Sequence, residues 1–428
     1  MATHRLISGS LPPPGWERRT DRGTGSPAGS HGPSRASPHA PKPCAWSSPG
    51  RCSPLQAEND PVVIAARRSP IGTRGRALAR LRVEELAAPV IRAALKDAEA
   101  VTGAPVTVAD VVLGNCMGPG GNPGRIAALA AGLGHGVPGA TVDRQCGSGL
   151  AAVLDAAAAI RAGDRRMRVA GGVESASTAP VRSVDGVAYD RAPFAPAGFS
   201  DPGMLQAAED LAARDGISRA RQDAHAARSH ARARAARDAG RFDAELVPLA
   251  GLRHDDAIGG AERLLPRLPA LFPSGTLTAG TSTRIGDGAA ALVLAPAGLA
   301  PGLAIRASAV VGCDPALPGI GAAGAIQAAL ESAGLDLADI DALEIVEAFA
   351  AQSLAVLERI GLAEDDPRLT ADGGALALGH PWGASGAVAV VRLFSRLVRA
   401  GAPAGTRGIA AASIGGGMGI AAVLEVVR

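Results

Sequence analysis

The chain has 428 residues, of which 47% are hydrophobic and 2% aromatic, and its formal net charge is +3 at pH 7. That length allows several domains with real cores, and the absence of a dense basic stripe beside aromatic residues argues against a nucleic-acid partner. No apolar run approaches the roughly 20 residues of a membrane helix, and the N-terminus lacks the apolar segment of a secretory signal. We therefore expect a cytoplasmic protein that does not bind membranes.

Five cysteines stand at positions 44, 52, 116, 146 and 313. Their spacing is not that of metal ligands, and a scattered, odd set is not typical of a disulfide framework. We expect no metal site, and any cysteine chemistry should be that of a single thiol.

Residues 1–58 differ in composition from the rest of the chain. They hold ten of the 32 prolines, with Ser, Gly and Arg between them. Such a segment cannot bury enough apolar surface to offset the entropy lost on ordering, which predicts a disordered tail. An Arg- and Ser-rich segment also fits a transit peptide, but its proline density opposes an amphipathic helix.

From residue 61 onward, strand-like runs alternate with helical periods. The run PVVIAARR at 61–68 predicts a buried strand, and VEELAAPVIRAALKDAEA at 83–100 predicts a helix with one apolar face. This alternation favours an α/β fold in which a parallel sheet is covered by helices.

The chain also contains an internal repeat. Residues 90–115 and 325–349 share the order helix, loop, acidic cap and apolar strand. Residues 146–175 and 382–417 share a turn of small residues, a helix, Arg-Ala-Gly, a strand and glycines. We expect two similar halves with an insertion at about 175–280, and a site at their junction.

Cys146 lies between an apolar strand run and Gly-Ser-Gly, which opens an Ala-rich helix. A thiol at a helix N-terminus meets the positive end of the helix dipole, so we expect its pKa to be lowered. This predicts a nucleophile, whereas the alternative is a small buried hydrophobic residue.

His380 holds the equivalent place in the second half, where it could accept the thiol proton for acyl transfer. A packed turn residue is the alternative. After the following helix, the sequence SIGGG ends a strand at residues 413–417. There the Gly415 N–H could stabilise an oxyanion, although a tight hairpin between core strands would also explain these glycines.

These motifs together resemble the thiolases, CoA-dependent acyltransferases that make or cleave β-ketoacyl-CoA. The resemblance covers about residues 60–428 and rests on GNPGRIAALAAGL, CGSGL, GGVES, GRFDAELVP, TLTAGTSTRIGDGAA, EAFAAQ, GGALALGHPWGASG and IGGGMG, in family order and spacing. It implies two βαβαβαββ halves in five αβαβα layers, an inserted loop domain that binds CoA, and a homodimer or homotetramer.

The resemblance also implies a domain division. We expect the tail at 1–58, an N-terminal domain at 59–299 that includes the CoA-binding loop domain at about 175–280, and a C-terminal domain at 300–428. CoA and acyl-CoA would be substrates, with no permanently bound cofactor.

The resemblance assigns roles to individual residues. Cys146 would be the acyl-accepting nucleophile and His380 its base, with the backbone amides of Cys146 and Gly415 holding the oxyanion. Arg253 would lie against the adenine of CoA. Thr283 stands where many relatives carry a serine near the pantetheine.

Two positions depart from the family pattern. Thiolases carry a second cysteine, which removes the α-proton of the attacking acetyl-CoA, where this chain has Ser413. They carry a water-anchoring asparagine where this chain has Val346. A hydroxyl is a far weaker acid than a thiol, so Ser413 would rarely be the alkoxide that a base requires. Val346 has no polar atom to hold a water.

Both departures affect enolisation of the second acetyl-CoA and leave loading of Cys146 unaffected. Three functions follow: a thiolase in which Ser413 replaces the cysteine, an acyltransferase whose acceptor is already nucleophilic, or a non-catalytic subunit that binds CoA or stabilises a partner.

Gly203 also stands where short-chain relatives carry a histidine, which leaves the acyl-chain preference open.

Overall fold

The computed structural model describes residues 59–428, so the expectation of a disordered tail at 1–58 lies outside the described residues. The first half contains β1 (Pro61–Arg68), β2 (Gly72–Thr73), α2 (Val83–Thr102), β3 (Val108–Gly114), α3 (Pro123–Ala130), β4 (Gly139–Val142), α4 (Ser148–Arg161), β5 (Met167–Ser175) and β8 (Gly286–Pro296). Between β5 and β8 lies an insertion with β6 (Arg182–Val184), β7 (Val187–Tyr189), α5 (Met204–Arg214), α6 (Arg219–Asp238) and the short helix η1 (Ala261–Arg267).

The second half repeats the plan of the first. It contains β9 (Gly302–Gly312), η2 (Pro318–Ile320), α7 (Gly321–Ala333), η3 (Leu337–Asp339), β10 (Ala342–Ile345), α8 (Ala350–Ile360), α9 (Ala375–Leu378), α10 (Trp382–Leu393), the π-helical turn η4 (Phe394–Arg399), β11 (Arg407–Ile414) and β12 (Met418–Val427).

The strands of both halves form one large sheet in the order β10-β11-β12-β9-β1-β8-β5-β3-β4, with β2 beside β8. In the first half, β3 and β5 are parallel, while β8 is antiparallel to β5 and β1 is antiparallel to β8. The second half has the same pairings among β10, β11, β12 and β9. This agreement confirms the internal repeat, and the halves join where β1 pairs with β9.

The expected parallel pairing is found between β3 and β5 and between β10 and β11, but the last strand of each half is antiparallel to its neighbour. In the second half the reason is local: β11 and β12 are joined by a short turn, and a turn of that length can only reverse the chain. The fold is therefore a mixed α/β fold.

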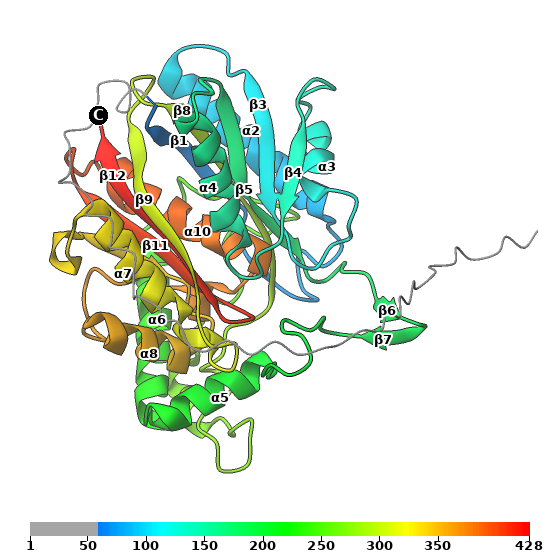
Figure 1. The fold of residues 1–428 in the computed structure, drawn as a ribbon, viewed down its shortest axis with the longest axis vertical. Helices are drawn as coiled ribbons and strands as arrows, with labels where there is room; N and C mark the ends of the chain where they lie inside the picture. The colour runs from blue at the N-terminus through cyan, green and yellow to red at the C-terminus, as the bar shows by residue number, and fades with distance from the viewer. Residues whose placement is uncertain (1–58) are drawn as a thin grey trace, which may run out of the picture. The chain divides into compact units, whose positions relative to one another are not determined.

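Three clusters of buried hydrophobic residues separate the layers. One surrounds α4 and α10 between the strands of the two halves, the second lies under α2, and the third lies under α7 and α8. Every residue of α10 from Gly383 to Leu393 is buried, which explains why this helix has no polar face. Figure 1 shows α4 and α10 in the middle of the molecule, which confirms the five αβαβα layers.

A buried ionic cluster attaches the insertion to the core. Arg68 of β1 binds Glu245 at 2.7 Å and Asp255 at 2.6 Å, and Arg392 of α10 binds the other oxygen of Glu245. Both guanidinium groups lie over the Phe242 ring, at 5.4 and 4.6 Å. Since removing one partner would leave a buried charge uncompensated, the cluster holds the insertion in one position.

Glycines allow the central helices to approach each other closely. A Cβ built on Gly149 of α4 would lie 2.8 Å from the Gly383 carbonyl oxygen, and one built on Gly386 of α10 would lie 2.7 Å from the Leu150 nitrogen. On β5, a Cβ on Gly172 would lie 2.0 Å from the same Gly383 oxygen. Any larger residue would separate the helices. The starts of α4 and α10 therefore lie side by side, and so do the residues that precede them.

We predict that Gly386→Ala lowers the melting temperature. A helical glycine-to-alanine change normally stabilises a helix by up to about 1 kcal/mol, but here the new Cβ meets the Leu150 backbone, and overpacking costs about 1–3 kcal/mol. The matched control is Gly324→Ala in α7, where the nearest atom, Val311 Cγ2, is 3.5 Å away, and this variant should melt at a higher temperature. Calorimetry of both proteins tests the packing; a Gly386→Ala protein that melts like the control would contradict it.

Candidate active site

Cys146 lies in a tight elbow between β4 and α4. The preceding residue, Gln145, has a φ of 46°, which is uncommon for a residue other than glycine. The Ser148 hydroxyl closes the elbow, since it accepts a hydrogen bond from the Arg144 N–H at 2.8 Å and donates one to the Gln145 carbonyl at 2.6 Å. The elbow places the Cys146 side chain, which is partly buried, ahead of the helix start.

His380 occupies the equivalent elbow before α10 and is only 2% exposed. Its Nε2 lies 3.3 Å from the Cys146 Sγ, so the structure brings together the two side chains that the repeat placed in equivalent positions. On the other side of the ring, Nδ1 lies 2.6 Å from the Ser385 hydroxyl.

The Ser385 hydroxyl determines which ring nitrogen of His380 carries the proton. It donates to the Pro381 carbonyl, at 3.0 Å, because a carbonyl can only accept. The Ser385 oxygen therefore accepts a hydrogen bond from Nδ1–H, and Nε2 keeps its lone pair facing the thiol. This is the tautomer that a base for Cys146 requires.

The glycines after Ile414 form a hairpin turn and also lie beside the thiol. They form the turn of the β11–β12 hairpin, where Ile414 pairs with Met418. In addition, the backbone N–H groups of Gly415 and Cys146 donate toward the Cys146 sulfur and favour its thiolate form by lowering its pKa. Two backbone donors that converge on the reactive atom form a candidate oxyanion hole.

The expectation that the helix dipole lowers the Cys146 pKa was wrong. Burial raises the pKa of the thiol to about 11, the two N–H groups reduce that shift, and the carboxylates of Glu174 and Asp143 add to it. Burial likewise lowers the pKa of His380 to about 4. At neutral pH the pair is therefore an uncharged thiol beside an uncharged imidazole.

Glu174, at the end of β5, connects the two elbows. This carboxylate is fully buried and accepts hydrogen bonds from the N–H groups of Cys116 and Met117, both at 3.1 Å, and of Gly383 at 3.0 Å. Burial raises its pKa to about 7, against the effect of these donors. Since Gly383 follows His380 by three residues, Glu174 fixes the start of α10 against a loop of the first half.

The sequence analysis assigned no role to Glu174 or Ser385, although both lie in motifs that it quoted. For Ser385 a signal was available, because a hydroxyl on the first turn of the helix after a histidine can reach back to the ring. No local signal marks Glu174, since its partners come from two distant segments.

Ser413 makes its hydrogen bonds with residues outside the thiol–imidazole pair. Its hydroxyl donates to the Gly319 carbonyl at 2.6 Å and accepts hydrogen bonds from the Ala322 N–H at 3.0 Å and the Gln352 side chain at 3.5 Å. Among the described residues, neither Cys146 nor His380 is one of its hydrogen-bond partners. These contacts connect the end of β11 to the start of α7.

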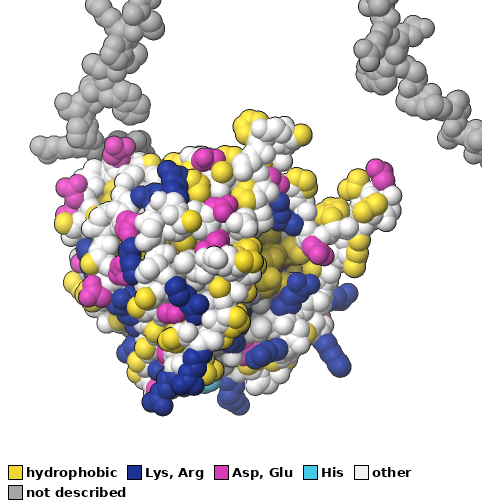
Figure 2. All heavy atoms as spheres, turned by 90° about the horizontal axis from the view of Figure 1, so that it is seen from below, with side chains coloured by type: hydrophobic (Ala, Val, Ile, Leu, Met, Phe, Trp, Pro, Cys, Tyr) yellow, Lys and Arg dark blue, Asp and Glu magenta, His cyan; other side chains and the backbone are white. Residues whose placement is uncertain are grey.

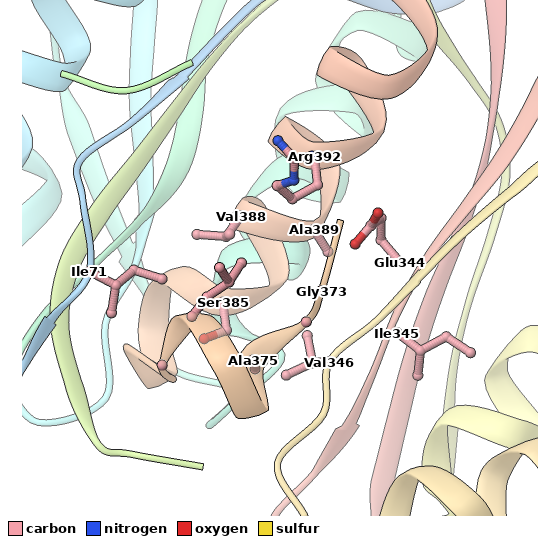
Figure 3. A pocket seen from close by; sticks show the side chains of 13 residues that line it. Ile71, Glu344, Ile345, Val346, Gly373, Ala375, Ser385, Val388, Ala389 and Arg392 are labelled. Carbon is pink, nitrogen blue, oxygen red and sulfur yellow. The ribbon is translucent and has the colours of Figure 1, made fainter. Parts of the chain in front are cut away.

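Val346 is 7% exposed and belongs to the apolar cluster around α10. It lines a cavity of about 30 Å³ behind the histidine, which Ser385, Glu344 and Arg392 also line. In Figure 3, Arg392 and Glu344 lie at one end of this cavity, and Val346 lies near the other. The side chain at position 346 therefore contributes only methyl groups to this wall.

Among the described residues, neither Arg253 nor Thr283 is a hydrogen-bond partner of Cys146 or His380. Arg253 is exposed in the loop before Asp255 and makes no side-chain hydrogen bond or ion pair with residues 59–428. Thr283 is partly buried, and its hydroxyl donates to the Ala375 carbonyl at 2.6 Å. Figure 2, the view from below Figure 1, shows a hollow with hydrophobic side chains and several Lys and Arg side chains around it.

Two negative findings apply to residues 59–428. No helix there is long and apolar enough to cross a membrane. No group of three or more His, Cys, Asp and Glu side chains there is arranged to hold a metal ion.

Comparison with known proteins identifies the class to which this fold and site belong. A model of the thiolase N-terminal domain matches residues 61–298, and a model of the thiolase C-terminal domain matches residues 299–426. The chain therefore belongs to the thiolase family.

Individual relatives match over nearly their whole length. The 3-ketoacyl-CoA thiolase of Salmonella typhimurium is 40% identical over 395 residues, covering 86% of this chain and 99% of the relative. The crystal structure of the Bacillus anthracis acetyl-CoA acetyltransferase superposes with a TM-score of 0.79 at 36% identity, covering 87% of this chain and 100% of that one. Human mitochondrial 3-ketoacyl-CoA thiolase superposes with a TM-score of 0.77 at 32% identity and the same coverage.

The protonation state of the pair leads to a pH prediction. Because the Cys146 pKa is raised to about 11, the thiolate fraction should rise about tenfold for each pH unit between pH 7 and 10. The rate of Cys146 alkylation by iodoacetamide, followed by peptide mass spectrometry, should rise in parallel. A plateau below pH 8 would show instead that an ion pair with His380 already exists at neutral pH.

Proposed function

We propose that this protein transfers acyl groups between CoA thioesters through an acyl-Cys146 intermediate, and thereby forms or cleaves β-ketoacyl-CoA. As a member of the thiolase family it is an acyltransferase of the acetyl-CoA C-acyltransferase type. The observation that carries the proposal is the 3.3 Å contact between the Cys146 Sγ and the His380 Nε2, whose tautomer Ser385 determines.

In the proposed loading step, Nε2 of His380 accepts the thiol proton as Sγ attacks the thioester carbon of an acyl-CoA. The N–H groups of Cys146 and Gly415 stabilise the tetrahedral oxyanion. When the intermediate collapses, the bond to the CoA sulfur breaks, and that sulfur receives the proton from His380. The products are acyl-Cys146 and free CoA. Starting from an uncharged pair suits this step, because the proton moves only when a substrate carbonyl is present.

In the proposed second step of synthesis, a base removes a proton from the α-carbon of an acetyl-CoA, and this carbon attacks the acyl-Cys146 carbonyl. The bond between the acyl carbon and the Cys146 Sγ then breaks and the sulfur regains a proton, which gives β-ketoacyl-CoA and free Cys146. This step requires a base, and Ser413 is the proposed candidate at the position where thiolases carry a cysteine. Its hydroxyl proton is donated to the Gly319 carbonyl and its oxygen accepts two hydrogen bonds. Ser413 must therefore give up this network in order to act.

A second function is favoured by those same contacts and by the apolar environment of Val346. An acceptor that is already nucleophilic, such as an electron-rich ring carbon, an amine or an alcohol, needs no enolising base. The chain would then pass the acyl group from Cys146 to that acceptor instead of making a β-ketoacyl-CoA. A non-catalytic CoA-binding subunit is the minor third alternative.

For CoA itself, we propose that the insertion is the loop domain that binds it, with Arg253 against the adenine and Thr283 near the pantetheine. The exposure of Arg253 and its lack of an ion pair among the described residues support an external ligand there. CoA and acyl-CoA would act as substrates only. We also propose that the domain boundaries lie between residues 58 and 59 and between residues 299 and 300.

We also propose a cytoplasmic homodimer or homotetramer. Support for an assembly comes from the hairpin β6–β7, which extends from the body of the molecule in Figure 1 and carries Val184 and Val187 at 60% and 71% exposure. Apolar side chains at such exposure favour burial against another chain.

The decisive measurement is the rate at which free CoA cleaves acetoacetyl-CoA. It compares three proteins that span residues 59–428: the wild type, the Ser413→Cys variant, and the Cys146→Ala variant as the blank. If Ser413 lacks base strength, Ser413→Cys should raise the rate at least about 100-fold, the scale of general acid–base catalysis. Comparable, robust rates in both proteins would establish Ser413 as sufficient for thiolase chemistry.

The same samples distinguish the alternatives. Acetylation of Cys146 by acetyl-CoA would appear as a mass increase on the intact protein. Acetylation without thiolysis would favour the function with an acceptor that is already nucleophilic. Absence of acetylation in both proteins would favour the non-catalytic subunit.

We further predict that Ser385→Ala slows acetylation of Cys146 by about fivefold, since one hydrogen bond that orients the imidazole is worth about 1 kcal/mol. Ser353→Ala is the matched control, because Ser353 is buried and its hydroxyl has no hydrogen-bond partner. Quenched-flow sampling with intact-mass detection gives both rates. Equal rates in the two variants would mean that Ser385 does not orient His380.

A further inference from the structure

An aromatic ring from the insertion lies on the proposed oxyanion hole. A Cβ built on Gly415 would lie 2.8 Å from the Phe194 Cε2 and 3.5 Å from the Met204 sulfur. A Cβ on the next residue, Gly416, would lie 3.3 Å from the Phe194 Cβ. The ring of Phe194 and the thioether of Met204 therefore lie beside Gly415, whose backbone N–H lowers the pKa of the Cys146 thiol.

The segment before α5 holds this ring in position. The Asp201 carboxylate accepts a hydrogen bond from the Phe194 N–H at 3.2 Å and binds the Arg191 guanidinium at 2.7 Å. Arg191 also donates to the Asp201 carbonyl at 3.1 Å and lies 4.8 Å from the centre of the Phe194 ring. A main-chain hydrogen bond and an ion pair thus fix the segment that carries Phe194, and the cation–π contact with Arg191 acts on the ring itself.

The Phe194 ring lies close to the place where an acyl group on Cys146 would begin. The carbonyl oxygen of an acyl group on Cys146 must reach the Gly415 N–H. The carbon chain of that acyl group therefore starts beside Gly415 and close to the Phe194 ring. Both neighbours there, a phenyl ring and a thioether, are apolar. They can contact an alkyl chain, but they offer no hydrogen bond to a polar substituent.

We infer that Phe194, held by Arg191 and Asp201, forms a wall of the acyl pocket and limits the length of the acyl group that Cys146 accepts. This inference rests on the proposed function, because it assumes an acyl-Cys146. Small differences in the size of an apolar pocket change substrate preference by about 10–200-fold, so truncation of the ring should have a measurable effect on chain-length preference.

The test measures acylation of Cys146 by acetyl-, butanoyl-, hexanoyl- and octanoyl-CoA, as mass increases on the intact protein over time. It uses acyl-enzyme formation alone, so it does not depend on Ser413 or on the acceptor. Phe194→Ala should raise the octanoyl-to-acetyl rate ratio by about tenfold or more. Phe194→Leu, which keeps an apolar side chain, should give a smaller rise and covers the possibility that the alanine variant does not fold.

The matched control is Phe199→Ala, in the same segment, because Phe199 is 67% exposed and its ring lies largely in solvent. This variant should keep the wild-type ratio. Arg191→Gln removes the ion pair with Asp201 and the cation over the Phe194 ring. It should give an octanoyl-to-acetyl ratio between those of the wild type and the Phe194→Ala variant.

Two results would overturn the inference, and they can be told apart. An unchanged ratio in both Phe194 variants, with acylation still observed, would show that the ring does not bound the acyl pocket while leaving the proposed function intact. Failure of the wild-type protein to form an acyl-enzyme with any of the four donors would overturn both.

Discussion

The close contact between α4 and α10 is the constraint on which the rest of the structure depends. Cys146 and His380 each precede one of these helices, so the distance between the helix starts sets the distance between the thiol and the imidazole. Glycine at positions 149 and 386 removes the side chains that would separate the helices. A buried carboxylate, Glu174, then holds the loop of the first half against the start of α10. The site thus follows from helix packing.

Burial determines the chemistry of the pair. In a low-dielectric interior the charged forms of a thiol and an imidazole are both disfavoured, so their pKa values move apart, to about 11 and about 4. In the proposed mechanism the nucleophile is therefore generated as the substrate binds, when backbone N–H groups stabilise the negative charge that develops on the acyl oxygen. Elsewhere the protein compensates buried charge by pairing, as Arg68 and Arg392 do with Glu245.

The two half-reactions of the proposed chemistry are supported unequally by the structure. The His380 Nε2 and the Gly415 N–H both lie beside the Cys146 sulfur, and Ser385 holds the far side of the imidazole, as loading requires. Ser413 instead makes its hydrogen bonds with the start of α7. The residues that would load an acyl group onto Cys146 are thus separate from the residue that would activate a second substrate. The nature of the acceptor decides between a thiolase and an acyltransferase with an acceptor that is already nucleophilic.

The sequence by itself determined the fold class, the two similar halves, and the equivalent positions of Cys146 and His380, because periodicity and repeated motifs are local properties of the chain. It also indicated both possible purposes of the glycines after Ile414. Only the tertiary structure decided the strand directions, the raised pKa of Cys146, and the contacts of Ser385, Glu174 and Phe194. Each of these depends on burial or on contacts between segments far apart in the chain. No local pattern reports how much water remains around a side chain or which distant group faces it.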